Sequence, residues 1–163
     1  MLAPDIDADL VAGTLYQGSA PIPTRTLRKS VHAICFAAWE YQPPKWWPDV
    51  MVLRAYLDDS GLPMDKDEKF QAVKVARQVR KLLDRNRTVL VTCHAGMNRS
   101  GLICALALGM PSMHQCRTPS NLTPAQAISA VRKARGPYAL SNDYFVAFIE
   151  SMGSLRSLSG SMW

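Results

Sequence analysis

The sequence has no apolar run long enough to cross a membrane. A membrane-spanning helix needs about 20 consecutive apolar residues, and every apolar segment of this 163-residue chain is shorter. The first residues, MLAPDIDADL, are acidic, whereas a secretory signal begins with cationic residues. We therefore expect a cytoplasmic protein that does not associate with membranes.

Cysteine is scarce and follows no metal-binding pattern. The four cysteines are Cys35, Cys93, Cys104 and Cys116, and no two of them have the C-x-x-C spacing of zinc sites. They also form no compact disulfide framework, which fits a reducing compartment. His114 and Cys116 share a loop, but two ligands are too few to hold a metal. We expect no metal and no other cofactor.

Acidic residues are outnumbered by basic ones. The chain has 19 Lys and Arg against 13 Asp and Glu, a net charge of +6. This charge suits anionic partners, such as phosphorylated substrates or nucleic acid, without distinguishing between them. Hydrophobic residues at 48% and charged residues at 20% are typical of a soluble globular protein. We expect one domain, residues 1–163, in which residues 153–163 form a flexible tail.

Patterns typical of strands and of helices alternate along the chain. Strand-like runs fall at residues 13–19, 31–39, 50–59 and 88–93. Helical spacing of apolar residues or helix boundary signals fall at residues 24–30, 66–85, 100–109, 123–135 and 141–152. This alternation predicts a single α/β domain with a central sheet.

A polar loop separates an apolar strand from an apolar helix in TVLVTCHAGMNRSGLICALAL, residues 88–108. The backbone N–H groups of CHAGMNR can curl around one tetrahedral anion, and the helix N-terminus adds its positive end. Gly96 permits the backbone angles of such a curl, and Arg99 can hold two phosphate oxygens. Such a cradle would favour Cys93 as a thiolate, which is a nucleophile for phosphoryl transfer. The competing interpretation is that Cys93 is an inert buried cysteine beside a surface arginine.

The same segment resembles a known family. CHAGMNRSG is similar to the phosphate-binding signature of the cysteine-dependent protein tyrosine phosphatases, specifically their small dual-specificity branch. GTLYQGS, VHAICFAAWE and YLDDSGLP resemble that branch's opening strand, second core strand and general-acid loop. Residues 123–149 resemble its closing helix pair, with Asn142 and Phe145 where the family has Asn and Phe. The resemblance implies a twisted, mostly parallel sheet of about five strands flanked by helices, and hydrolysis through a phosphocysteine.

The match also implies roles for individual residues. Cys93 would be the nucleophile, Arg99 the phosphate clamp, and Ser100 the hydroxyl that helps the thiolate leave in the second step. The substrate-binding residues implied by the match are His94, Ala95, Gly96, Met97, Asn98 and Arg99. The chain departs from the family at Thr92, where the family usually has the histidine that orients the loop.

A general acid is implied as well, because the leaving alkoxide or phenoxide needs a proton. The pattern AYLDDSGLP sets Asp59 at the position of the family's acid, and Asp58 is the alternative. A third interpretation is that the two carboxylates merely end a strand and cap a turn.

Two further cysteines bear on regulation. Either Cys35 or Cys104 could form a protective disulfide with Cys93 after oxidation, as in some relatives of the family. The alternative is that each is a small buried hydrophobic residue.

Three functions remain open at this point. The first is a protein phosphatase that acts on phosphotyrosine, with phosphoserine and phosphothreonine as further candidate substrates. The lip of the loop lacks the lysines that phosphatases of highly charged inositol phosphates place there. The second is a polynucleotide 5′-phosphatase acting on RNA ends, because MNRSGLIC also resembles RNA triphosphatases, which typically work without the aspartic acid. The third, suggested by Thr92, is a phosphate-binding module with weak catalysis. Oligomeric state is not predicted.

Overall fold

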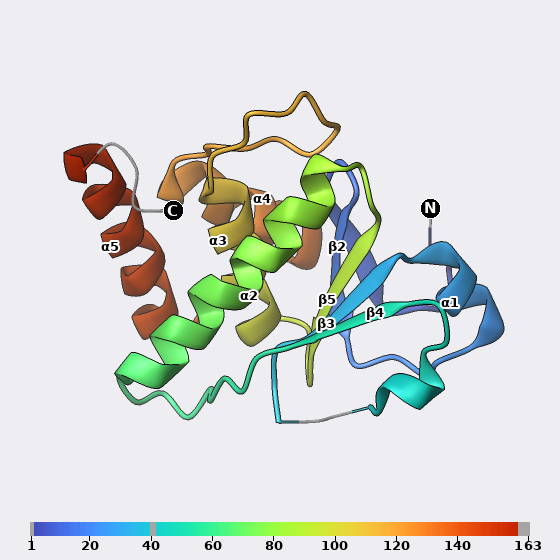
Figure 1. Cartoon of the computed structure of the whole chain (residues 1–163). Coiled ribbons are helices and arrows are strands. Elements are labelled where there is room, and N and C mark those ends of the chain that lie inside the picture. Colours follow the sequence, from blue (N-terminus) through green and yellow to red (C-terminus); the bar gives the residue numbers. More distant parts are fainter. Residues whose placement is uncertain (1, 40–41, 160–163) are drawn as a thin grey trace.

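The computed structural model describes residues 2–39 and 42–159 and contains one five-stranded sheet (Figure 1). The strands lie in the order β1-β2-β5-β3-β4. β2, β5, β3 and β4 are parallel, and β1 is antiparallel to β2. Their bounds are β1 (Ala8–Ala12), β2 (Leu15–Ser19), β3 (Ala33–Phe36), β4 (Met51–Arg54) and β5 (Val89–Cys93). The predicted mostly parallel sheet of about five strands is confirmed.

The central strands are apolar on both faces, as a sheet between two layers requires. Successive side chains of a strand point to opposite faces. In β3, Ala33 and Cys35 therefore belong to the larger core cluster, whereas Ile34 and Phe36 belong to a smaller cluster on the other face. This double burial explains why the strand appears in the sequence as a continuous apolar run.

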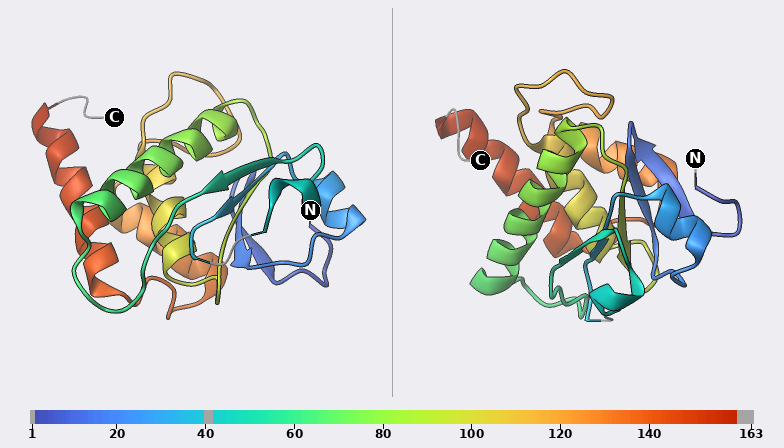
Figure 2. Two further views of the ribbon diagram at one scale, coloured as in Figure 1. Left: turned by 60° about the horizontal axis from the view of Figure 1, so that its bottom comes forward. Right: turned by 45° about the vertical axis from the view of Figure 1, so that its right-hand side comes forward.

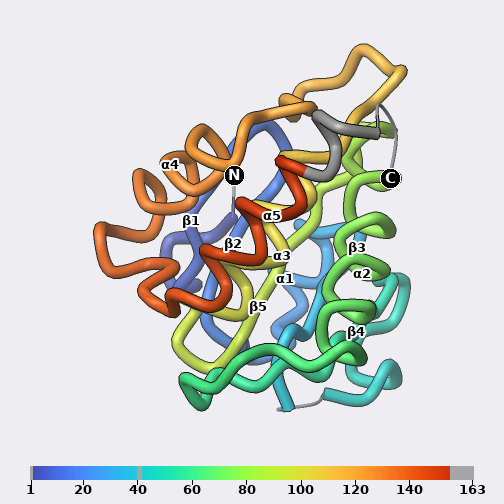
Figure 3. The backbone as a smooth tube through the Cα atoms, turned by 90° about the vertical axis from the view of Figure 1, so that its left-hand side faces the viewer, coloured from blue at the N-terminus to red at the C-terminus, as the bar shows by residue number. Residues whose placement is uncertain are grey.

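Four helices lie on one side of the sheet (Figures 1 and 2): α2 (Lys66–Asp84), α3 (Arg99–Gly109), α4 (Pro124–Arg135) and α5 (Asp143–Ser159). Seen from that side, α5 lies over α3, with α2 and α4 on either side (Figure 3). The smaller core contains Leu27 of α1 (Arg25–Ser30) and Trp47, which directly follows the short 3-10 turn η1 (Pro44–Trp46). There Trp47 packs edge-to-face against Phe36. No helix in the described part of the chain is long and apolar enough to span a membrane.

The sequence does not predict the first strand. β1 has the sequence ADLVA, its side chains are exposed or half-buried, and its register with β2 shifts between Leu10 and Ala12. Such a segment has neither the apolar run nor the clear alternation that indicates a strand. A turn at Gly13, with a φ of +56°, leads into β2, which begins at Leu15 rather than at residue 13.

The next two strands are shorter than predicted. The runs at residues 31–39 and 50–59 are strands only within β3 and β4, and residues 37–39 and 55–59 belong to loops beyond the carboxyl ends of these strands. Asp58 and Asp59 therefore lie in a loop after β4. Because the carboxyl ends of parallel strands meet at one edge of a sheet, this loop emerges at the same edge as Cys93.

The last helix continues beyond its predicted end at residue 152. α5 reaches Ser159, so residues 153–159, predicted as part of a flexible tail, are helical. Gly153 does not end the helix, since an interior glycine costs only about 1 kcal/mol relative to alanine. A Cβ at Gly153 would overlap the ring of Pro124, so the missing side chain lets α5 approach α4 closely. The rest of the predicted tail, residues 160–163, lies outside the described residues.

Candidate active site

The predicted phosphate-binding segment lies at the carboxyl edge of the parallel strands. β5 ends at the buried Cys93, residues 94–98 form a loop, and α3 begins at Arg99. In open α/β sheets, the loops at the carboxyl ends of the strands are the usual place for ligands. The fold thus places the sulfur where the chain turns from a sheet into the positive end of a helix.

The carbonyl groups of this loop are held by the surrounding protein. The Gly96 oxygen accepts hydrogen bonds from Gln17 Nε2 at 3.1 Å and from Arg135 Nε at 3.0 Å. The carbonyl before it accepts from Arg135 Nη2 at 3.4 Å, and the Met97 oxygen accepts from the Leu140 N–H at 3.3 Å. A trans peptide points its N–H opposite to its C=O. The N–H groups that follow are therefore directed away from these partners, as an anion cradle requires.

Gly96 is needed in this loop for two reasons. Its φ of +68° lies in the left-handed region, which other residues adopt with strain. A Cβ at this position would also lie 2.5 Å from the Gly18 carbonyl carbon and 2.7 Å from Arg135 Nη2. The loop can pack against β2 and against Arg135 only because residue 96 has no side chain.

The first N–H groups of α3 are not capped by a side chain. Asn98 occupies the N-cap position, but its side chain makes no hydrogen bond to the helix. Its Nδ2 donates instead to Asp59 at 3.0 Å, and its Oδ1 accepts from the Asn142 N–H at 3.3 Å. The helix N–H groups, with the positive end of the helix dipole, therefore suit an anion.

Arg99 is the first residue of α3. Its Nε is buried and has no hydrogen-bond partner among the described residues. Buried polar groups are nearly always paired, so this guanidinium fits a site that binds an anion. Its planar fork matches two oxygens of a phosphate.

A hydroxyl lies beside the sulfur. Cys93 Sγ is 3.2 Å from the Oγ of the buried Ser100, in the first turn of α3. Ser100 Oγ also accepts a hydrogen bond from Gln17 Nε2 at 3.1 Å. A thiol donates to this oxygen, whereas a thiolate accepts the proton of the hydroxyl. The arrangement therefore allows Ser100 to stabilise negative charge on the sulfur.

Of the two candidate acids, Asp59 is bonded to the loop. Its Oδ2 accepts from Asn98 Nδ2 at 3.0 Å and its Oδ1 accepts from Asn142 Nδ2 at 2.7 Å. Asp58 lies instead within electrostatic reach of α2. Burial and the charges of neighbouring carboxylates, Asp58 among them, raise the pKa of Glu68 in its first turn. The structure therefore brings Asp59 to the loop and points to a different environment for Asp58.

Arg135, in the last turn of α4, connects the loop to the N-terminal region. Its side chain is 7% exposed, and Nη1 donates to Asp7 at 2.9 Å and to Asp9 at 2.7 Å. Burial acts to lower the pKa of Arg135, but the hydrogen bonds to these carboxylates outweigh it and raise the pKa. The hydrogen bond from Arg135 lowers the pKa of Asp7. A cation fixed by two carboxylates thus holds the loop carbonyls.

Asp7→Asn is expected to reduce thermal stability slightly at neutral pH and not in acid. Because Arg135 holds the folded-state pKa of Asp7 below its ordinary value of 3.8, the stabilisation is present above pH 3.8 and is lost as the pH falls through the lower folded value. The Asp7 side chain is 63% exposed, so the effect at neutral pH is at most about 1 kcal/mol. Tm measured near pH 7 and near pH 3 tests this, with Asp5→Asn as a charge-matched control. A Tm difference that grows in acid would contradict the assignment.

The two cysteines of the core are protonated thiols. Cys35 and Cys104 are fully buried, and burial raises the pKa of both. Interactions with Cys35 and with Cys93 raise the pKa of Cys104 further, so Cys104 lies within electrostatic reach of both. All four cysteines are free. A disulfide with Cys93 after oxidation stays a prediction.

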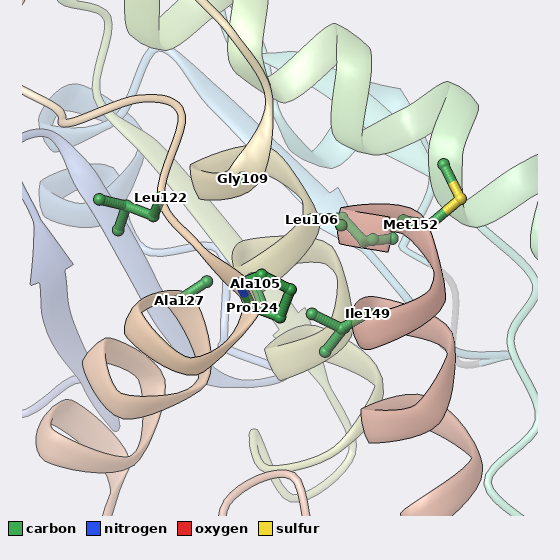
Figure 4. Close-up of a pocket in the computed structure, with 9 residues that line it drawn as sticks. Ala105, Leu106, Gly109, Leu122, Pro124, Ala127, Ile149 and Met152 are labelled. Carbon is green, nitrogen blue, oxygen red and sulfur yellow. The ribbon is translucent and has the colours of Figure 1, made fainter. Parts of the chain in front are cut away.

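An apolar pocket lies elsewhere, among α3, α4 and α5 (Figure 4). It adjoins Gly109 at the C-terminal end of α3, whereas the loop precedes the N-terminal end of that helix. Its cavity volume is about 20 Å³, roughly the space that one water molecule needs. The side chains around it include Ala105, Leu106, Leu122, Ala127, Ile149 and Met152, none of them titratable. This pocket has no group that can act on a phosphate.

The sequence does not single out two residues that hold the site together. Gln17 follows Leu15 by two positions on β2, so the only sequence signal is a polar residue at an inward-facing position. Arg135 stands in a basic helix end, where a cation is expected for the helix dipole alone. The predicted residues Cys93, Ser100 and Asp59 are brought to the same loop, as described above.

The sequence matches the model of one known protein family. A family model described as "Protein-tyrosine phosphatase" matches residues 47–152. No match was found among curated protein sequences.

The fold is similar to that of several solved structures. A mouse putative dual specificity phosphatase complexed with zinc tungstate has a TM-score of 0.76 at 20% identity, over 98% of this chain and 94% of that one. Human DUSP28 has a TM-score of 0.73 at 21% identity, over 96% and 98%. PTPMT1 in complex with PI(5)P has a TM-score of 0.61 at 21% identity, over 93% and 99%. At these identities the likeness concerns the fold.

Proposed function

Because the chain belongs to the protein-tyrosine phosphatase family and is a cysteine-dependent phosphatase, we propose that it hydrolyses phosphotyrosine in proteins through a phosphocysteine on Cys93. One observation carries the proposal. The Cys93 sulfur lies 3.2 Å from the buried Ser100 hydroxyl. In the loop that follows, the Gly96 carbonyl accepts a hydrogen bond from Gln17, and the Asn98 side chain donates to the carboxylate of Asp59. These contacts support a nucleophile, an anion cradle and a general acid at one loop.

In the first step the substrate phosphate is held by the loop N–H groups and by Arg99. The Cys93 thiolate attacks phosphorus, a P–S bond forms, and the P–O bond to the tyrosine oxygen breaks. The electron pair of that bond goes to the leaving oxygen, which takes a proton from Asp59. The hydrogen bonds from Asn98 and Asn142 to Asp59 support this role, because they hold the carboxyl group beside the loop.

In the second step water attacks the phosphorus of the phosphocysteine. A new P–O bond forms, the P–S bond breaks, and its electron pair returns to the sulfur. The water proton passes to Asp59, which was deprotonated in the first step. Ser100 donates its hydroxyl proton in a hydrogen bond to the departing thiolate and so stabilises its charge.

The rim of the loop supports a substrate of modest charge. The rim consists of His94 and Ala95, which are exposed, and of Met97 and Asn98, which are half-buried. None of these four residues is a lysine or an arginine. A highly phosphorylated inositol or a triphosphate would gain little from such a rim. A single phosphate on an aromatic leaving group needs only the cradle and the acid.

A second candidate, a polynucleotide 5′-phosphatase, is favoured by one feature, the asparagine directly before Arg99. In this structure the same Asn98 side chain donates to Asp59. Asn98 can therefore position Asp59 as the general acid. Because the asparagine then fits a mechanism that uses an aspartic acid, it supports the protein phosphatase.

Rates with four substrates test the proposal: p-nitrophenyl phosphate, a phosphotyrosine peptide, a triphosphate-ended RNA, and vesicles that contain PI(5)P. We expect kcat/KM for the peptide to exceed the values for RNA and lipid by at least about tenfold. Faster phosphate release from RNA would make the second candidate the better one, and faster release from the vesicles would indicate a lipid phosphatase. Tight peptide binding without turnover would indicate a phosphate-binding module.

A further inference from the structure

A polar side chain that no predicted role explains lies beneath the loop. Gln17, on β2, is completely buried and faces the start of α3. Its Nε2 lies 3.1 Å from the Gly96 oxygen, 3.1 Å from Ser100 Oγ and 3.4 Å from the Met97 oxygen. We propose that Gln17 is a positioning residue, which aims the hydroxyl proton of Ser100 at the sulfur of Cys93. The proposal rests on the phosphocysteine mechanism described above.

The direction of the hydrogen bonds follows from the atoms available. Carbonyl oxygens only accept, so the group of Gln17 that faces Gly96 and Met97 must be its NH₂. That NH₂ has two protons, and one of them is directed to Ser100 Oγ. Ser100 Oγ then accepts from Gln17 and has its own single proton left to donate. Cys93 Sγ, at 3.2 Å, is the neighbour placed to receive it.

The cost of burying this amide argues against a purely structural purpose. Gln17 Oε1 is buried and has no hydrogen-bond partner among the described residues. A buried carbonyl without a partner is unfavourable, and an aliphatic side chain at this inward position would avoid the penalty. The two N–H donors of Gln17, which are directed at the loop and at Ser100, are what this side chain provides and an aliphatic one would not.

Thr92 does not supply the same contact, although it precedes the nucleophile directly. Successive residues of β5 face opposite sides of the sheet, so Thr92 and Cys93 point to different layers. The buried Thr92 hydroxyl donates to the Cys35 carbonyl oxygen at 3.3 Å, within the sheet. Gln17 is therefore the described side chain, besides Cys93 itself, that connects the sheet to Ser100 by a hydrogen bond.

The consequence for the reaction is specific to one step. Attack by the thiolate needs the cradle and Arg99, whereas departure of the thiolate from phosphorus needs a proton aimed at the sulfur. Loss of Gln17 should therefore slow hydrolysis of the phosphocysteine more than its formation. At metal sites, removal of such an orienting outer partner costs about ten- to hundredfold, and we expect a loss of similar size here.

Gln17→Met tests the proposal, because methionine keeps the length and approximate volume of the side chain and removes both N–H donors. Rapid-quench kinetics with p-nitrophenyl phosphate separate the burst of nitrophenolate from steady turnover. We expect the burst to be retained, phosphoenzyme to accumulate, and kcat and KM to fall together by about tenfold or more, so that kcat/KM is little changed. The inhibition constant of inorganic phosphate should also be preserved. Thr92→Val removes an equally buried polar group next to Cys93 and is expected to behave like the parent enzyme.

A second pair of variants shows whether the effect passes through Ser100. In a Ser100→Ala background there is no hydroxyl to aim, so adding Gln17→Met should not slow phosphoenzyme hydrolysis further. Additive losses would overturn the proposal, as would unchanged kcat in Gln17→Met alone. Equal loss of the burst and of phosphate inhibition would show that Gln17 only supports the loop. If the parent enzyme itself forms no phosphoenzyme, the proposed mechanism fails rather than this inference from it.

Discussion

Cys93→Ser is expected to lower turnover of p-nitrophenyl phosphate by at least about 10⁴-fold while anion binding is retained. A serine hydroxyl is a far weaker nucleophile than a thiolate unless a base activates it, and single removal of a nucleophile can cost about as much as removal of the whole catalytic set. The loop carbonyls remain bonded to Gln17 and Arg135, so the cradle keeps its shape. Steady-state kinetics and calorimetric titration with tungstate measure the two effects.

Cys116→Ser is the matched control for this experiment. Cys116 is partly exposed and contacts Arg80 beneath the loop that follows α3, away from the candidate site. The same chemical change there should leave both turnover and tungstate binding at the parent values. Near-normal turnover by Cys93→Ser would exclude Cys93 as the nucleophile, and loss of tungstate binding would show that the sulfur is needed to shape the cradle.

Asp59→Asn is expected to slow hydrolysis of a poor leaving group by about 10² to 10⁴, the usual value of general acid catalysis. Tyrosyl and alkyl phosphates need the proton, whereas nitrophenolate leaves with little help, so its loss should be much smaller. Rates for a series of aryl phosphates, plotted against leaving-group pKa, should become steeper in the variant. Asparagine keeps a carbonyl oxygen that can accept from Asn98 or Asn142, so the loop contact survives in part.

Asp58→Asn is the control, because it makes the same change at the adjacent residue. Asp58 is exposed and interacts with the start of α2, so we expect parent rates for every leaving group. Parent rates on phosphotyrosine peptides in both variants would mean that no aspartate of this loop is the acid. The polynucleotide phosphatase would then be the stronger candidate.

The difference between what the sequence predicts and what it does not has a physical origin. Cys93, Arg99 and Ser100 fall within eight residues of chain, between a strand and a helix that their own apolar patterns indicate. Short-range geometry then suffices to predict an anion cradle. Helix ends depend on weaker preferences, which is why α5 continues through Gly153.

The contacts that shape the cradle join distant parts of the chain. Gln17 is 79 residues from Gly96, and Arg135 is 128 residues from Asp7. Periodicity reports which face of an element is buried, but not which polar group of another element will meet it there. β1 is missed for the same reason, since its Asp9, and Asp7 just before it, are explained by Arg135 and not by any local pattern.

The position of Arg135 late in the chain has a consequence for synthesis of the protein. Asp7 and Asp9 leave the ribosome first, but their partner follows only after α3 and most of α4 have been made. A nascent chain that ends at residue 122 already carries Cys93, Arg99, Ser100 and Asp59. It still lacks Arg135, which donates a hydrogen bond to the Gly96 carbonyl of the loop, and Asn142, whose amide donates to Asp59. Because such long-range contacts form late, the growing chain holds every reactive group before it has the means to arrange them.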